Sequence, residues 1–369
     1  MSDVLSLLKE LIARPSVSPF DAGCQEIIAE RLTRAGFVVE SLRFGETDNL
    51  WARMGTGPVR LCFNGHTDVV PPGPIEDWSS DPFEPTERDG YLYGRGASDM
   101  KSGVAAMVVA LERLAASGEA DGLALLLTSD EEAKADDGTV RALRFLLERG
   151  EVIQNALVAE PTSVSVLGDT CKPGRRGSLT GRITVQGVQG HVAYAHLAEN
   201  AAHSLAPALS ELVSERWDEG DEFFPPTSMQ VWELRSGAGA SNVIPGEAFV
   251  GLNFRNGPSS PANVLIQRTE QIFAKHGVRF DAVWNASAVP FLSPPGALAE
   301  KVASAIRSVT GIETNLSTGG GTSDARHFVA EGIETIEFGL VPVAMHGIDE
   351  RVRIADLERI AEVLFFVSA

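Results

Sequence analysis

Short apolar runs alternate with longer amphipathic segments in the first and last parts of this 369-residue chain, and this alternation limits the fold most. An apolar period of three to four residues predicts helices at 3–13, 22–35, 102–116, 139–149, 297–309 and 354–366. The strand-like runs between them cover 59–64, 123–128, 156–159 and 333–338. Strands that are apolar throughout and separated by helices pair in parallel and are covered on both faces. The sequence therefore predicts an α/β fold with a mostly parallel, mixed sheet flanked by helices.

The middle of the chain has a different order of elements. Between residues 179 and 289 a βαββαβ order is expected, with strands at 179–187, 228–234, 247–254 and 278–284 and helices at 199–214 and 261–275. This order is typical of the α+β ferredoxin-like split unit. The turn-rich stretches "KPGRRGS" and "VPFLSPPG" flank it. We therefore predict a discontinuous α/β domain made of 1–178 and 290–369, interrupted by an inserted α+β domain at 179–289.

Composition narrows the class of partner and the compartment. The chain has 31 basic and 50 acidic residues, and its formal net charge of −19 disfavours nucleic acid and anionic membrane surfaces. No apolar run reaches the ~18 residues of a membrane span, and the acidic amphipathic N-terminus does not resemble a signal peptide. Cys24, Cys62 and Cys171 are odd in number and far apart, which predicts free thiols. We expect a cytoplasmic protein with neither nucleic acid nor membrane as partner.

The stretch "NGHTDVVPPG" places a histidine and an aspartate at the end of the first buried strand. Residues two apart in an extended segment point to the same side, so the carboxylate of Asp68 can accept the ring N–H of His66. The other ring nitrogen is then free, as in a histidine that binds a metal. The alternative is a polar loop that happens to contain a histidine.

Four further stretches bring chemically active side chains to the ends of predicted strands, where α/β sheets bind ligands. They are "LYGRGASDMKSG" with Asp99, "TSDEEA" with Glu131 and Glu132, "ALVAEPT" with Glu160, and "EFGLVPVAMHGIDERV" with His346. Taken singly, Asp99 could be a helix N-cap, residues 130–132 a solvated acidic loop, and Glu160 a loop charge.

Together these residues favour a metal centre. Two histidines with several carboxylates suit zinc, cobalt or manganese rather than calcium. Five ligands exceed what one catalytic zinc takes from protein, so two ions that share a carboxylate, and act together on a hydrolytic water, fit better. In the pair Glu131–Glu132, one residue can then bind metal while its neighbour serves as general base.

These motifs, with "RRGS", "GVQGHVAYAHLAENAAH", "SNVIPGEAFVGLNFR" and "GGGTSDARHF", resemble the succinyl-diaminopimelate desuccinylases over nearly the whole chain. That family belongs to the dinuclear zinc aminoacylase and carboxypeptidase superfamily. The resemblance implies a homodimer that hydrolyses N-succinyl-L,L-2,6-diaminopimelate to succinate and L,L-diaminopimelate in lysine and diaminopimelate biosynthesis. It also implies two zinc ions per subunit, with cobalt able to replace zinc at one site.

The resemblance further assigns metal ligands to residues of this chain. His66 and Glu160 would hold one zinc ion, Glu132 and His346 the other, and Asp99 would bridge them. The peptide bond that follows Asp99 is expected to be cis.

The same resemblance assigns catalytic and substrate-binding roles. Glu131 would be the general base and acid, Asp68 would orient His66, and His191 of the other subunit would stabilise the oxyanion. The substrate carboxylates would be bound by Arg175, Ser178, Asn242, Arg255, Gly321 and Thr322.

One departure from the family pattern concerns the substrate. Pro342 stands where family members often carry an asparagine that contacts it, and proline offers neither a side-chain donor nor an N–H. An acetylornithine deacetylase or a broader N-acyl-amino-acid hydrolase is therefore the alternative within this chemistry. A non-catalytic binding protein on a hydrolase scaffold is the alternative outside it. A dinucleotide site at "YGRGASDMKSG" is disfavoured because its glycines lack the G-x-G-x-x-G spacing.

Overall fold

The computed structural model describes residues 3–369, and these form two compact units. Unit 1 runs from the start of the described chain to Gly174 and also contains Leu292–Ser317 and Ser323–Ala369. Unit 2 contains Arg175–Phe291 and the short segment Thr318–Thr322. The sequence pattern gave no sign that this short segment belongs with unit 2. The roles expected of the two predicted domains, catalysis at a dinuclear metal centre for 1–178 with 290–369 and dimerisation or a lid for 179–289, remain predictions.

The main sheet of unit 1 has the order β1-β2-β6-β3-β7-β18. Its strands are β1 (Val38–Phe44), β2 (Thr47–Arg53), β3 (Leu61–His66), β6 (Leu123–Thr128), β7 (Asn155–Val158) and β18 (Glu334–Glu337). The last four in sequence are parallel to one another, whereas β2 is antiparallel to both β1 and β6. The predicted α/β fold with a mixed, mostly parallel sheet is therefore confirmed, and the β1–β2 hairpin is an addition to it.

Helices cover both faces of this sheet. One face packs against α1 (Asp3–Ile12), α2 (Cys24–Arg34), α3 (Lys101–Ser117), α7 (Ala297–Thr310) and α9 (Ile354–Ser368), and the other against α4 (Thr139–Glu148) and α8 (Ala325–Ala330). Successive residues of β3 alternate between the two cores: Leu61 and Phe63 join the first, and Cys62 joins the second. Burial on both faces explains why the strands are apolar throughout.

A smaller antiparallel sheet in unit 1 joins parts of the chain that are far apart in sequence. It consists of β4 (Thr86–Arg88), β5 (Tyr91–Tyr93) and β19 (Arg351–Arg353). Because β5 pairs with β19, the segment that leads to α3 lies beside the segment that precedes α9. Unit 1 also contains η1 (Ile75–Asp77) and a two-stranded parallel pair, β8 (Thr170–Cys171) with β17 (Asn315–Leu316).

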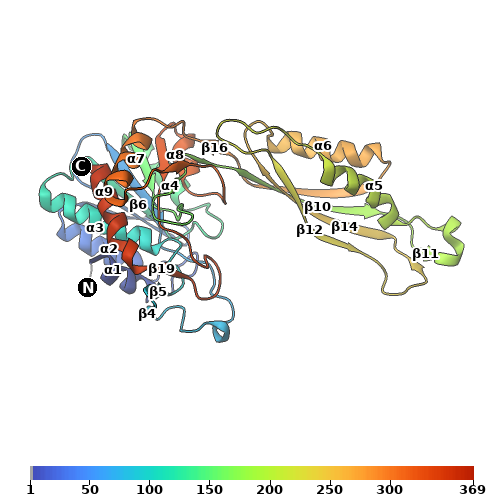
Figure 1. Cartoon of the computed structure of the whole chain (residues 1–369), viewed down its shortest axis with the longest axis horizontal. Helices are drawn as coiled ribbons and strands as arrows, with labels where there is room; N and C mark the ends of the chain where they lie inside the picture. Colours follow the sequence, from blue (N-terminus) through green and yellow to red (C-terminus); the bar gives the residue numbers. More distant parts are fainter. Residues whose placement is uncertain (1–2) are drawn as a thin grey trace. The chain divides into compact units, whose positions relative to one another are not determined.

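Unit 2 is a four-stranded antiparallel sheet covered by two helices on one face (Figure 1). The sheet has the order β12-β14-β10-β15, which is that of a split βαβ unit, and its strands are β10 (Gly177–Gln186), β12 (Ser228–Ser236), β14 (Glu247–Asn256) and β15 (Phe280–Ala288). The helices α5 (Ala201–Ser214) and α6 (Ala262–Lys275) pack onto it through Leu205 and Phe273. The strands β11 (Gly190–His191) and β13 (Val243–Ile244) form a short separate pair. The 3-10 helix η2 (Val192–Leu197) directly follows β11 in the chain.

Two expectations drawn from composition have structural counterparts. Cys24, Cys62 and Cys171 are buried, and none of them forms a disulfide. Within residues 3–369, every helix falls short of the length and apolar character needed to cross a bilayer.

Candidate metal centre

Three strands of the main sheet carry candidate ligands at their carboxyl ends. The strand β3 ends at His66, β6 is followed by Glu131 and Glu132, and β7 is followed by Glu160. His66 lies opposite Thr128, the last residue of β6, and these strands are parallel. The side chains therefore gather at one edge of the sheet, as the sequence predicted.

Asp99 reaches this edge by a different route from the one predicted. It follows β5, which belongs to the smaller sheet, and not a strand of the main sheet. The helix α3 begins at Lys101, and its N-cap residue is Met100. The side chain of Met100 makes no capping hydrogen bond. The N-cap alternative for Asp99 is therefore wrong. The peptide bond Asp99–Met100 is cis, which confirms the expectation.

Among the described residues, two groups of side chains are candidate metal-binding sets, and both contain Asp99. The first is His66, Asp99 and Glu160, and the second is Asp99, Glu132 and His346; within each group the ligand atoms lie within 4.8 Å of one another. The Nε2 atom of His66 lies 3.4 Å from Oδ1 of Asp99, and Nε2 of His346 lies 3.2 Å from Oδ2. Each histidine therefore faces a different oxygen of the one shared carboxylate.

The remaining distances complete the two groups. The Nε2 atom of His66 is 3.6 Å from Glu160 Oε1, and that of His346 is 2.9 Å from Glu132 Oε1. The two histidines differ in exposure: the side chain of His66 is 1% exposed and that of His346 is 45% exposed. The first group is thus enclosed by protein and the second opens to solvent.

The electrostatics of the site fit divalent cations. His66 Nε2 and Asp99 Oδ1 are buried and make no hydrogen bond within the described chain, which is costly for polar atoms. Hydrogen bonds to Asp99 and Glu132 raise the pKa of His346 to about 10. Burial opposes protonation of His66, but the nearby carboxylates of Asp68, Asp99 and Glu160 raise its pKa well above the ordinary value. This strong negative field is what a pair of divalent cations would neutralise.

Asp68 connects His66 to the acidic loop after β6. Its carbonyl oxygen lies 2.9 Å from Nδ1 of His66 and its Oδ1 lies 3.5 Å away, so the closer partner of the ring is the backbone oxygen and not the predicted carboxylate. Its carboxylate accepts the backbone N–H groups of Glu131 (3.3 Å) and Glu132 (3.2 Å) and the hydroxyl of Ser18. The structure therefore links Asp68 to the acidic loop as well as to His66, a contact that the sequence did not reveal.

Glu131 lies partly buried next to the two groups without belonging to either. Burial raises the pKa of its carboxyl well above the usual range, and the nearby charges of Glu160, Asp324 and Glu132 raise it further against the opposing effect of His66. A carboxyl group that is not a metal ligand and lies beside such ligands is suited to accept and return a proton as a general base and acid.

The residues predicted to bind the substrate carboxylates lie in unit 2. Arg175 is buried, with 5% of the residue exposed, and its Nη1 donates to the carbonyl oxygen of Gly321 (3.2 Å). Ser178 in β10 lies directly opposite Arg255 in β14. Thr322 ends the short segment that belongs to unit 2.

His191 and Asn242 lie in another part of unit 2, near the short β11–β13 pair. The carbonyl oxygen of Asn242 accepts the N–H of Val192 (3.1 Å). The exposed ring of His191 accepts the N–H of Ala193 at Nδ1 (3.1 Å), which leaves the proton of the neutral ring on Nε2. Neither residue belongs to the two metal-binding groups.

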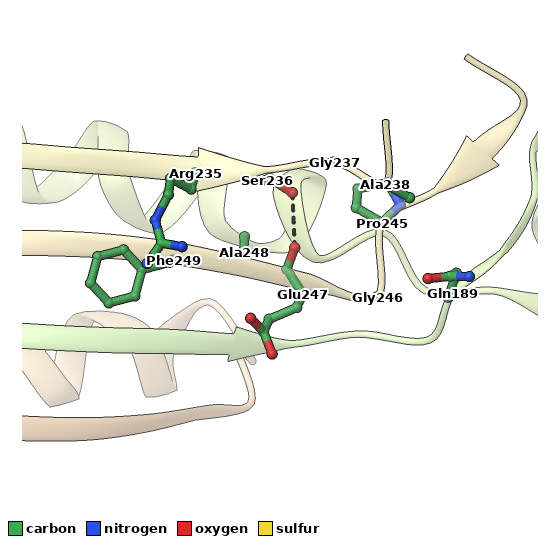
Figure 2. Close-up of a pocket in the computed structure, with 10 residues that line it drawn as sticks. All are labelled: Gln189, Arg235, Ser236, Gly237, Ala238, Pro245, Gly246, Glu247, Ala248 and Phe249. Carbon is green, nitrogen blue, oxygen red and sulfur yellow. Dashed lines mark hydrogen bonds between the residues drawn. The ribbon is translucent and has the colours of Figure 1, made fainter. Parts of the chain in front are cut away.

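A cavity in unit 2 is lined by other residues. It encloses about 400 Å³ at the ends of β12 and β14 (Figure 2). Arg235 stacks over Phe249 on one side of it, with the guanidinium carbon 4.5 Å from the ring centre, and Ser236 donates to the carbonyl oxygen of Glu247 (2.9 Å). Its lining contains none of the predicted site residues, so this cavity is not part of the candidate site.

Comparison with known proteins identifies the family of the chain. The model of Peptidase family M20/M25/M40 matches residues 62–367, and the chain belongs to that family. Among its relatives, the succinyl-diaminopimelate desuccinylase of Bordetella petrii is 53% identical over 364 residues, which cover 98% of this chain and 96% of the relative. The protein of the same name from Bordetella avium is 52% identical and covers 98% and 97%.

Solved structures show the same fold at low sequence identity. The M20 family metallo-carboxypeptidase Sso-CP2 from Sulfolobus solfataricus is 17% identical, with a TM-score of 0.79 over 100% of this chain and 99% of that one. The YXEP protein of Bacillus subtilis, described as a dinuclear metal binding peptidase from M20 family, is 13% identical, with a TM-score of 0.69 over 99% and 96%.

Proposed function

We propose that this chain is a metal-dependent amidohydrolase that converts N-succinyl-L,L-2,6-diaminopimelate to succinate and L,L-diaminopimelate. Relatives that are 52–53% identical over nearly the full length carry the name of that activity. The observation that carries the proposal is the pair of ligand groups that share Asp99, with Glu131 beside them. Such a hydrolase would serve lysine and diaminopimelate biosynthesis. The three buried cysteines, which form no disulfide, are in keeping with work in the reducing cytoplasm.

The metals proposed for the site are two zinc ions, with cobalt able to replace zinc at one position. His66 and Glu160 would hold one ion, Glu132 and His346 the other, and Asp99 would bridge them. Mixed imidazole and carboxylate ligands suit both metals. When bound, such a pair lowers the pKa of a water molecule and polarises the scissile carbonyl group.

The residues of the chain then have distinct tasks in the reaction. Glu131 accepts a proton at its carboxylate as water attacks the amide carbonyl, and it delivers that proton to the amine nitrogen that leaves. Asp68 contacts both the ring of His66 and the backbone N–H of Glu131, so it holds the general base and the metal ligand in fixed positions relative to each other. The C–N bond breaks and the proton from water ends on the amine, which balances the hydrolysis.

His191 is proposed to stabilise the oxyanion in the active site of a second subunit. The hydrogen bond from Ala193 to Nδ1 supports this role, since it leaves Nε2–H as an exposed donor. The surrounding segment also presents apolar side chains to solvent: Val192 is 47%, Tyr194 59% and Leu197 69% exposed. Apolar groups gathered around a proposed catalytic group suit a surface that is covered in a dimer.

A homodimer is therefore the expected state in solution. Sedimentation velocity at micromolar concentration should give a particle of two chains, because the exposed segment 192–197 would be covered by the partner. The variant Tyr194→Asp should shift the particle towards one chain, whereas Val164→Asp, at a still more exposed position in unit 1, should not. A wild-type monomer would refute both the dimer and the role of His191 in trans.

Substrate recognition is proposed to depend on cations in unit 2. Arg175 and Arg255 offer guanidinium groups that can bind a carboxylate through two hydrogen bonds. Ser178 lies opposite Arg255, and the carbonyl oxygen of Gly321 holds Arg175. With Asn242 and Thr322 they form the proposed set of substrate contacts.

The test of the function is a comparison of two substrates with zinc-loaded protein. N-succinyl-L,L-diaminopimelate should be hydrolysed with a kcat/KM about 10- to 150-fold higher than that for N-acetylornithine, because a lost charge-assisted hydrogen bond costs about 1.5–3 kcal/mol. The variant Arg255→Met should narrow that ratio mainly through KM, and Arg268→Met, on α6 of the same unit, should leave it unchanged. Preference for the acetyl substrate would favour the acetylornithine deacetylase alternative and point to Pro342 and its loop. No hydrolysis of any N-acyl amino acid would favour a binding protein.

A further inference from the structure

A buried ion pair lies next to the metal centre and has no assigned part in it. Arg95 Nη1 donates to Oε2 of Glu350 at 2.6 Å, and the two side chains are only 2% and 1% exposed. Withdrawing two charges from water is costly, and their attraction repays that cost only when further hydrogen bonds satisfy them. The other contacts of the pair therefore indicate what it does.

Glu350 binds the segment that carries Asp99. Its Oε1 accepts the backbone N–H groups of Ser98 (2.8 Å) and Asp99 (3.0 Å), and its Oε2 accepts that of Gly96 (3.1 Å). Hydrogen bonds to a carboxylate are stronger than those between neutral groups. One side chain thus fixes the main chain up to and including the residue shared by both ligand groups.

Arg95 binds the segment that carries His346. Its Nη2 donates to the carbonyl oxygen of His346 at 3.3 Å and to that of Pro71 at 3.4 Å. His346 has a φ of +60°, a left-handed conformation that residues other than glycine rarely adopt. Such a conformation persists where the surroundings enforce it, and the bond from Arg95 to its carbonyl group is one such restraint.

We propose that Arg95 and Glu350 are positioning residues of the dinuclear centre. Glu350 sets the position of Asp99 for both ions, and Arg95 sets the position of His346 for one of them. The inference rests on the metal site proposed above and not on the identity of the substrate. It differs from a purely structural role because it predicts effects on metal binding that loss of stability alone does not produce.

Zinc binding to the metal-free protein, measured by calorimetric titration, provides the test. The variant Glu350→Gln keeps the size of the side chain but places an NH₂ group against backbone donors or Arg95. It should weaken both zinc-binding steps by about 10- to 100-fold, the usual effect of losing a group that supports ligands. Arg95→Lys keeps the charge beside Glu350 but loses the planar fork, so it should weaken only the step that uses His346. The absorption spectrum of the cobalt-loaded protein should change more in Glu350→Gln, which affects both metal positions, than in Arg95→Lys, which affects one.

The control is a second ion pair of the same unit. Arg53 at the end of β2 binds Glu151, which precedes β7 and so lies towards the opposite edge of the sheet from the ligands. Glu151→Gln should lower the melting temperature and leave both zinc dissociation constants unchanged. A folded Glu350→Gln protein that binds zinc like the wild type would overturn the proposal. If that variant does not fold, Arg95→Lys decides: no effect, or an equal effect on both steps, would overturn it. Wild-type protein that binds no zinc would instead refute the metal site itself.

Discussion

Replacement of Glu131 by glutamine is expected to lower kcat by about 10²- to 10⁴-fold while zinc binding stays as in the wild type. Glutamine has nearly the same shape but cannot accept a proton from water or return it to the amine. Glu131 belongs to neither ligand group, so the metal centre should remain intact. Steady-state kinetics with the succinyl substrate, together with zinc content after dialysis, would measure both effects.

The matched control for this variant is Asp136→Asn. Asp136 is an exposed carboxylate on the same connection between β6 and α4, so its loss changes the charge of the loop without touching the proposed base. It should keep nearly all activity. A Glu131→Gln enzyme that keeps more than about a tenth of wild-type kcat would mean that another group moves the proton. Loss of zinc from that variant would mean that Glu131 acts on the metal centre instead.

The parallel core of unit 1 could be predicted because its strands are continuously apolar runs separated by segments with helical periodicity. The run 123–128 is a strand over the predicted range, and β7 and β18 agree within a residue or two. These strands are buried on both faces, which makes them continuously apolar and easy to recognise. The hairpin of β1 and β2 was missed. The strand β1 lies at the sheet edge with polar residues such as Glu40 and Arg43 among its apolar ones, so its pattern is weak.

The candidate ligands could be identified from the sequence, but the strand pairing and hydrogen bonds that hold some of them in place could not. Parallel strands end at one edge, which is enough to bring His66, Glu132 and Glu160 together. Asp99 reaches that edge through the pairing of β5 with β19, a contact between residues about 260 positions apart that no local pattern reveals. The bonds of Glu350 to the 96–99 segment depend on the same pairing. The only local signal for Glu350 is an acidic residue in "HGIDERV", close after His346.

Asp99 is the residue whose loss should do most damage to the metal centre, since each of its oxygens faces a different histidine. The variant Asp99→Ala should bind well below two zinc ions per chain and should show no measurable hydrolysis. Glu160→Ala, which removes a ligand from one group only, should keep the ion held by Glu132 and His346. Zinc content at a fixed free zinc concentration, measured by mass spectrometry, separates these outcomes. Melting temperatures recorded with and without zinc provide a second measure, because a metal at 100 times its Kd stabilises the folded state by about 2.7 kcal/mol.

The comparison of the two variants distinguishes a shared ligand from two neighbouring sites. If Asp99 bridges the ions, its removal takes away one ligand from each and leaves each group with only one histidine and one carboxylate. If it serves only one ion, Asp99→Ala and Glu160→Ala should each lose a single equivalent of zinc and equal parts of the zinc-dependent rise in melting temperature. Equal losses would therefore mean two independent ions, and Glu131 would then have to act beside only one of them.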